Sequence, residues 1–276
     1  MAKSLLEKVK AFDKTGTIKT EVDGAVRLLR DFRAKYRFVK NPESIEALNP
    51  DDIFKLHPAE VGEFFHWLEY YLKPIGHLTL YSRVYRRIRN QLDDFKELLH
   101  VTVDPKKSLA EKVDAPWDRI KGMGYDRHIA KKIIYCFNYE DGDILPIFNT
   151  RHLEHFYNEV VDKPSFPAKY VTLGEKYQFL ISELLGVKQS LPEAQTWELP
   201  YFSRFLYDNY PHLTWTNLYS RQVKKQEQTI RRETNRSNSE HSSSCLMNCK
   251  EKESSQQRST EITGNSGRKD LKIGDY

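Results

Sequence analysis

The sequence predicts a mainly α-helical protein, with a compact multi-helix domain in residues 1–220 and a disordered tail in residues 221–276. Apolar residues recur at spacings of three and four through most of the first region, which places them on one face of a helix. No series of alternating apolar and polar segments indicates an extensive sheet. The second region is polar and has no apolar periodicity, so it cannot bury enough surface to offset the entropy of ordering.

Residues 1–40 predict two short helices on either side of Thr15-Gly16. The apolar side of the second helix is formed by Val22, Val26, Leu29 and Phe32. Further helix starts are indicated by prolines that follow a polar residue, because proline fits the first helical position. These pairs are Asn41-Pro42, Asn49-Pro50 and His57-Pro58. The aromatic-rich stretch after Pro58, which ends at Pro74 and Gly76, is predicted to be a core helix.

One longer helix is predicted over about residues 80–99. Its buried stripe is Val84, Ile88, Leu92, Phe95 and Leu99. Arg83, Arg86 and Arg87 fall on the opposite side, where guanidinium groups can contact nucleic-acid phosphates. The alternative interpretation is a solvated face whose arginines pair with acids of the same helix. The pairs considered are Arg87 and Arg89 with Asp93 and Asp94.

Two capping boxes predict further helix starts, because a Ser or Thr and a Glu three residues later satisfy each other's free N–H groups. They are Ser108–Glu111 and Thr172–Glu175. Another helix is predicted near residues 197–207. A short strand is expected at residues 101–103 or 144–148, and the rest of the domain is expected to be helix and loop.

The stretch from Arg119 to Phe156 is predicted to organise the domain. Gly122 and Gly124 favour a turn with positive φ, a helix follows, and Asn149 or Thr150 caps a second helix. The basic residues at the turn and along the first helix are Lys121, Arg127, Lys131 and Lys132. This pattern indicates either a core hairpin with a solvated basic face or a nucleic-acid contact on a rigid scaffold.

The net charge of +5 is unevenly distributed. Residues 221–276 hold 12 basic and 8 acidic side chains, which leaves 32 and 31 in residues 1–220. The predicted domain is therefore near neutral, and contact with an acidic partner must depend on local clusters.

Three cysteines do not form a disulfide framework and suit a reducing, cytoplasmic compartment. No apolar run approaches the roughly 18 residues that span a bilayer, so no membrane partner is expected.

Motifs for catalysis are absent from the sequence. We find no G-x-x-x-x-G-K-[ST], no G-x-S-x-G and no H-E-x-x-H. His241, Cys245 and Cys249 lack a fourth metal ligand. Asp94-Phe95-Lys96 has the D-x-K form of many nucleases but lies in a predicted helix rather than on a strand. We therefore expect no catalytic residue, no cofactor and no metal.

Lys121-Gly-Met-Gly124 resembles the hairpin of the helix-hairpin-helix DNA glycosylases. In that family, hairpin N–H groups bind phosphate and an Asp further along the chain acts in catalysis. Pro146–His152 is similar to the segment that bears this Asp, but the matching position holds Asn149 or Thr150, and an amide cannot act as the carboxylate base. If the protein nevertheless released a base, Asp141 or Asp143 would be the carboxylates expected to act.

A second resemblance covers roughly residues 40–160. Phe64–Gly76, then Lys132–Phe137 followed by Leu145–Phe156, resemble the recognition region that precedes the motor in McrB-like AAA+ restriction proteins. In that family the N-terminal region recognises the target, while the motor domain hydrolyses GTP and activates the partner nuclease. The resemblance implies a DNA-recognition module of a restriction or defence system, without its own motor, which works with a separate AAA+ motor or nuclease subunit.

We therefore expect a DNA-binding recognition module rather than an enzyme. Two alternatives stay open, a glycosylase-like protein that uses the hairpin and a helical protein-interaction module with no nucleic-acid role. If the helix over residues 80–99 packs beside the glycine turn, the two form one positive surface. The expected nucleic-acid contacts are Arg83, Arg86, Arg87, Lys121, Gly122, Gly124, Arg127, Lys131 and Lys132.

Overall fold

The structure is a computed structural model that describes residues 4–76, 78, 82–162, 164–165 and 172–212. This part of the chain is mainly helical, as the sequence predicts. The chain divides into two units, residues 1–211 and 212–276, and every helix and strand given below belongs to the first. The expected tail and its His241, Cys245 and Cys249 lie outside the described residues.

The helical segments of the first half are α1 (Leu5–Ala11), α2 (Thr17–Lys35), a 3₁₀-helix (Pro42–Ala47), α3 (Pro50–Ile53), α4 (Glu63–His66), a π-helical turn (Trp67–Tyr71), a 3₁₀-turn (Lys73–Ile75), α5 (Ser82–Asn90) and α6 (Leu92–Val103). Those that follow are α7 (Leu109–Asp114), a 3₁₀-turn (Trp117–Arg119), α8 (His128–Asn138), a 3₁₀-turn (Tyr139–Asp141), α9 (Thr150–Val160), α10 (Leu173–Ser190) and α11 (Leu199–Asn209). The short strands β1 (Phe54–Lys55) and β2 (Glu60–Val61) pair antiparallel.

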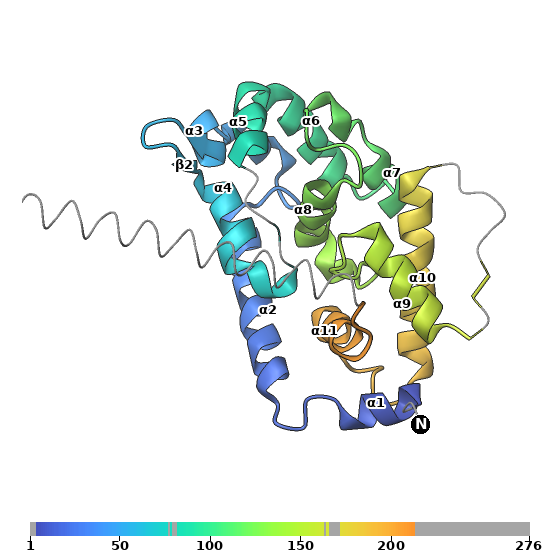
Figure 1. The fold of residues 1–276 in the computed structure, drawn as a ribbon. Helices are drawn as coiled ribbons and strands as arrows, with labels where there is room; N and C mark the ends of the chain where they lie inside the picture. Colours follow the sequence, from blue (N-terminus) through green and yellow to red (C-terminus); the bar gives the residue numbers. More distant parts are fainter. Residues whose placement is uncertain (1–3, 77, 79–81, 163, 166–171, 213–276) are drawn as a thin grey trace, which may run out of the picture. The chain divides into compact units, whose positions relative to one another are not determined.

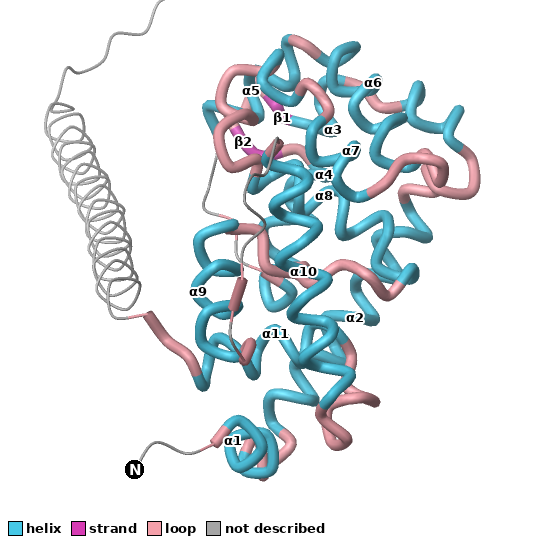
Figure 2. The backbone as a smooth tube through the Cα atoms, turned by 90° about the vertical axis from the view of Figure 1, so that its right-hand side faces the viewer, coloured by secondary structure: helices cyan, strands magenta, loops and turns pink. Residues whose placement is uncertain are grey.

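Helix α8 lies at the centre of the fold, between α6 and α2, and every residue from Ile129 to Asn138 is buried. Helix α10 packs against α7 and α9, and α11 packs against α2. In Figures 1 and 2, α11 lies between α2 and α9, while α3, α5 and the two strands lie together at the other end of this unit. The predicted organising role of residues 119–156 thus has a physical basis in a helix that is buried on all sides.

Aromatic rings fill much of the core around α8. Phe32 of α2 lies 5.4 Å from Phe137 of α8 and 5.7 Å from Phe64 of α4, measured between ring centroids. Phe65 and Tyr85 stack with their centroids 4.0 Å apart, which joins α4 to α5. All five rings are buried, and burying each of them stabilises the fold by about 2–3 kcal/mol.

The prediction of a single helix over residues 80–99 is wrong, because the helix is interrupted at Gln91. This residue has a φ of −123° and a ψ of 46°, outside helical geometry, and it forms the N-cap of α6. Its side-chain amide donates to the carbonyl of Arg119 (3.2 Å), a contact from a distant segment. Tertiary contact thus ends α5 at a point where the apolar spacing continues without interruption.

Other expected elements need correction. Asn49 caps α3 with a full capping box, but Pro42 opens a 3₁₀-helix and His57-Pro58 lies in the turn between β1 and β2. The helix expected after Pro58 begins only at Glu63. The strand expected at residues 101–103 or 144–148 is also wrong, since the first segment ends α6 and the second has no regular structure.

The predicted starts and apolar faces of the longer helices are confirmed. Both expected capping boxes are present, at the starts of α7 and α10. Asn149 caps α9, as one of the two predicted choices, and its side chain accepts from the backbone N–H of Arg151 (2.9 Å). The apolar side predicted for α2 is buried along its whole length, although α2 is 19 residues long rather than short.

Candidate nucleic-acid interface

Helix α5 presents arginines to solvent while it is anchored by its apolar side. Val84 and Ile88 are buried, as the stripe predicts, and Tyr85, which is not part of that stripe, is buried as well. Arg83 and Arg86 are exposed, and the Arg86 guanidinium lies 5.4 Å from the ring centroid of Phe54. The anchored face fixes the helix, so the exposed arginines are held in place by the core rather than by ion pairs.

Helix α5 packs directly beside the glycine turn. Arg87 is half-buried, and its Nη1 donates to the backbone carbonyl of Lys121 (2.9 Å). Gly122 has a φ of +104°, and a Cβ at this position would lie 2.8 Å from Cγ2 of Val84. Glycine is therefore required here both by the backbone conformation and by the contact with α5. Lys121 is exposed, and its backbone is held against α5 through its carbonyl.

Tyr125, which the sequence reasoning missed, is the most exposed large apolar side chain among the described residues. It is 90% exposed and has a φ of +58°, a conformation that tyrosine rarely adopts. Its place one residue after Gly124 is the signal that would have pointed to it. An exposed aromatic ring at a tight turn offers a flat face on which a base can stack.

Lys131 and Lys132 do not belong to this surface, which corrects the sequence-based expectation. Both are fully buried, with a relative exposure of 0%, because α8 is enclosed on all sides. The Nζ of Lys132 donates to the carbonyls of Leu72 (2.9 Å) and Gly76, and burial lowers the pKa of Lys132 to about 8. An ammonium group that caps internal carbonyls cannot reach a phosphate without unfolding its surroundings.

Arg127 also points inward. Its Nη1 donates to the carbonyl of Val113 (2.8 Å) and to Oδ1 of Asp114 (2.8 Å), and its side chain is 18% exposed. The same Asp114 oxygen accepts from the backbone N–H of Gly174 at the start of α10 (2.9 Å). Arg127 therefore ties the turn to α7 and α10 and is a structural residue rather than a contact.

A carboxylate, Asp126, joins the turn to α9. Its Oδ2 accepts from the backbone N–H of Thr150 (3.0 Å) and its Oδ1 accepts from Nζ of Lys131 (2.9 Å). The Thr150 hydroxyl donates to Oδ1, and His128 Nε2 lies within hydrogen-bond reach of Oδ2. Lys131 also donates to the Thr150 hydroxyl (2.7 Å) and lies 4.5 Å from the ring centroid of Tyr177.

These contacts set the charges of the network. Burial raises the pKa of Asp126, but the contacts with His128, Lys131 and Thr150 outweigh burial and hold this pKa below its usual range. Burial lowers the pKa of Lys131 to about 8, against the attraction of Asp126. Asp126 is therefore an ionised structural acceptor. Asp126, rather than the expected candidates Asp141 and Asp143, is thus the carboxylate that contacts Thr150.

The other cations near α5 are paired. Arg89 Nη1 contacts Asp51 and donates to the carbonyl of Phe54 (2.8 Å), while Arg87 bonds to the carbonyl of Lys121. The alternative interpretation, in which these two arginines pair with Asp93 or Asp94, is therefore wrong. Further pairs join Arg119 to Glu97 (3.1 Å) and Lys96 to Glu46 (3.5 Å).

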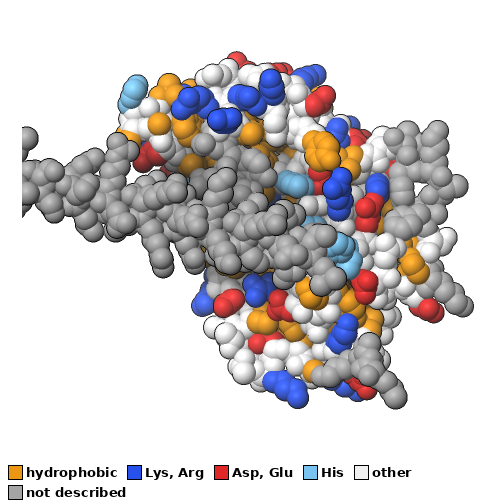
Figure 3. Space-filling view, in the orientation of Figure 1, with side chains coloured by type: hydrophobic (Ala, Val, Ile, Leu, Met, Phe, Trp, Pro, Cys, Tyr) orange, Lys and Arg blue, Asp and Glu red, His pale blue; other side chains and the backbone are white. Residues whose placement is uncertain are grey.

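Around α5 and the glycine turn, the cations without a carboxylate partner among the described residues are Arg83, Arg86, Arg87 and Lys121. Lys and Arg side chains gather over the region of α5 at the top of Figure 3. One exposed carboxylate, Asp118, lies beside the turn, where its Cβ would be 3.1 Å from a Cβ at Gly124. The positive surface is therefore local, centred on α5.

Within the described ranges, no group of three or more His, Cys, Asp or Glu side chains is arranged to hold a metal ion. No described helix is long and apolar enough to cross a membrane. Comparison with known proteins finds no matching family model, no matching curated protein and no matching solved structure.

Proposed function

We propose that the chain is a DNA-binding recognition module whose contact surface is formed by α5 and the turn over residues 121–125. The observation that carries the proposal is the pair Arg83 and Arg86. Both are exposed, and neither is within ion-pair distance of a carboxylate in the described part of the chain. Guanidinium groups free of carboxylates can form charge-assisted, bidentate bonds to phosphate.

The turn adds the other elements of a nucleic-acid contact. Lys121 supplies an exposed ammonium group next to α5, and Tyr125 supplies an exposed ring. Arg87 contributes by fixing the turn through the Lys121 carbonyl, so it acts as a positioning residue as well as a charge. Phosphate contacts hold the strand and an aromatic ring stacks on a base, which is the combination expected of a compact recognition surface.

The proposal assigns recognition rather than chemistry to this chain. Asp126, the carboxylate bound to Thr150, is surrounded by donors and has a lowered pKa, which does not suit a proton acceptor. By its resemblance to McrB-like proteins, we propose a separate AAA+ motor or nuclease subunit of a restriction or defence system as the partner.

The proposal is tested by measuring the binding of a fluorescein-labelled 20-base-pair duplex by anisotropy. The variant Arg83→Ala/Arg86→Ala removes two charges from α5, and the control Arg27→Ala/Arg37→Ala removes two exposed charges, one on α2 and one in the turn that follows it. We expect the first to weaken binding by about tenfold or more and the second by less than about threefold. Equal losses in the two variants would mean that net charge alone attracts DNA, and the proposal would be wrong.

A further inference from the structure

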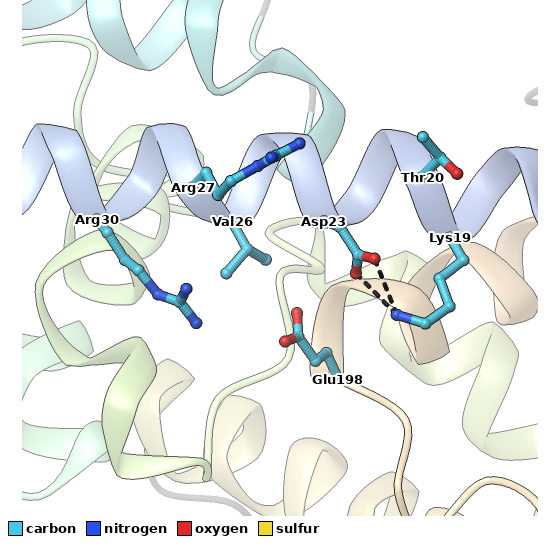
Figure 4. A pocket seen from close by; sticks show the side chains of 7 residues that line it. All are labelled: Lys19, Thr20, Asp23, Val26, Arg27, Arg30 and Glu198. Atoms are coloured by element: carbon cyan, nitrogen blue, oxygen red, sulfur yellow. Dashed lines mark hydrogen bonds and ion pairs between the residues drawn. The ribbon is translucent and has the colours of Figure 1, made fainter.

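A second basic surface, which the sequence reasoning did not single out, runs along α2 and the turn that follows it. Residues 27–40 contain six basic side chains and one acidic side chain. At 100° per residue, Lys19, Asp23, Val26 and Arg30 share one face of the helix. In Figure 4, these four point to the same side of α2 as Glu198, which lies at the start of α11.

This face forms the wall of two adjoining hollows. One lies between Lys19, Val26, Arg30 and Glu198, and the other continues past Arg30 to Lys40. Arg30 lines both, so the two hollows adjoin at this residue. We call the two hollows together the α2 groove.

Most of the cations of the α2 groove lack a carboxylate partner among the described residues. Arg27, Arg30, Arg37 and Lys40 are exposed, and none is within ion-pair distance of a described Asp or Glu. Arg30 bonds to the hydroxyl of Tyr139, a neutral partner. The side chains that line the groove therefore carry a positive charge that the structure does not neutralise.

The groove also holds negative and apolar side chains. Lys19 pairs with Asp23 (2.9 Å), and Arg33 pairs with Glu140 (2.8 Å). Glu198 is exposed and forms no ion pair with a described residue. Val39, at the end of the groove, is 37% exposed.

This mixture decides between two kinds of ligand. A nucleic-acid strand carries a phosphate at every step, so its backbone would meet the carboxylates of Asp23, Glu140 and Glu198 at intervals along the groove. A peptide carries charge only at chosen positions, so its acidic residues can face the arginines while its apolar residues face Val39. The pattern therefore favours a peptide.

We propose that the α2 groove binds an extended, acidic peptide segment of a partner protein. The part of α2 that lines the groove, from Lys19 to Ala34, spans about 23 Å at 1.5 Å per residue, which corresponds to roughly seven residues of extended peptide. Recognition of acidic segments by arginine clusters is a known mode of peptide binding. The α2 groove thus supplies a protein contact that is independent of the α5 surface.

The test uses the full chain and a fluorescein-labelled octapeptide with four Glu, two Val and two Gly residues. The test variant is Arg30→Glu/Arg37→Glu, with Arg27→Glu/Lys40→Glu as a second variant on the same groove. The matched control is Arg83→Glu/Arg86→Glu, which makes the same charge change on α5. A peptide with Lys in place of Glu and an eight-nucleotide dT strand are the ligand controls.

We expect the acidic peptide to bind the parent at low salt, and each α2 variant to weaken this binding by about tenfold or more. The α5 variant should bind it within about twofold of the parent, and the Lys peptide should not bind. Absence of binding to the parent, or equal losses in the α2 and α5 variants, would overturn the proposal. If only the dT strand loses affinity in the α2 variants, the groove is a nucleic-acid site and the peptide proposal is wrong.

Discussion

Replacing Asp126 by Asn tests whether one ionised carboxylate joins the glycine turn to α9. The substitution keeps the shape of the side chain and removes its charge. The ammonium group of Lys131 then stays fully buried, in contact with the Thr150 hydroxyl and the ring of Tyr177 but with no anion. The change therefore isolates the charge of the network.

The cost follows from the burial of Lys131. Breaking a buried pair by removing one partner typically costs about 3–5 kcal/mol, because an uncompensated charge remains. Lys131 is 0% exposed and the Asp126 side chain is 14% exposed, so solvent screens this pair little. We expect Asp126→Asn to lower the free energy of unfolding by about 3–5 kcal/mol, and Asp126→Asn/Lys131→Met to be more stable than the single variant.

The effect is measured by urea denaturation of the parent, Asp126→Asn, Lys131→Met and the double variant, which together form a double-mutant cycle. The lowered pKa of Asp126 means that its contribution is complete above the unfolded value of about 4 and is lost as the pH falls further. The difference between the parent and Asp126→Asn should therefore shrink below pH 4. A loss below about 1 kcal/mol at pH 7, or a difference that does not depend on pH, would refute the reasoning.

Three further predictions concern other residues. Burial lowers the pKa of Lys132 to about 8, so above pH 8 the unfolded chain binds more protons than the folded chain. The free energy of unfolding should therefore rise by up to about 2 kcal/mol between pH 8 and 9.5. Denaturation curves of Lys132→Met should show a smaller rise. Gly122→Ala should cost more stability than Gly142→Ala, because both glycines have a positive φ but only Gly122 contacts Val84; equal melting temperatures for the two variants would contradict this. Ser108→Ala removes the side-chain cap of α7 and should cost about 1 kcal/mol in urea denaturation, with no effect on DNA binding.

Local signals in the sequence predict much of the fold. The capping boxes at Ser108 and Thr172 and the apolar repeat of α2 depend on residues within a few positions of each other. Such features appear in the sequence because each is complete within one element. The interruption of the helix at Gln91 does not appear in the sequence, because the side chain of Gln91 contacts the carbonyl of Arg119, 28 residues away.

The candidate site was predicted only where exposure follows from helical spacing. Arg83 and Arg86 lie opposite the buried stripe of α5 and are exposed as predicted. Lys131 and Lys132 are charged residues on a helix, which are normally exposed, and spacing gives no sign that Asp126 and the carbonyl of Leu72 would surround them. Their burial depends on contacts between distant elements.

The salt dependence of DNA binding tests the central claim most directly. Each phosphate contact contributes about 0.9 to the slope of log Kd against log salt concentration. Arg83→Ala/Arg86→Ala removes two proposed contacts and leaves Arg87, which holds the turn through the Lys121 carbonyl, in place. In the full chain, we predict a slope about 2 smaller than that of the parent, with an unchanged melting temperature. A slope equal to that of the parent would show that these arginines do not contact phosphate and would contradict the proposed interface.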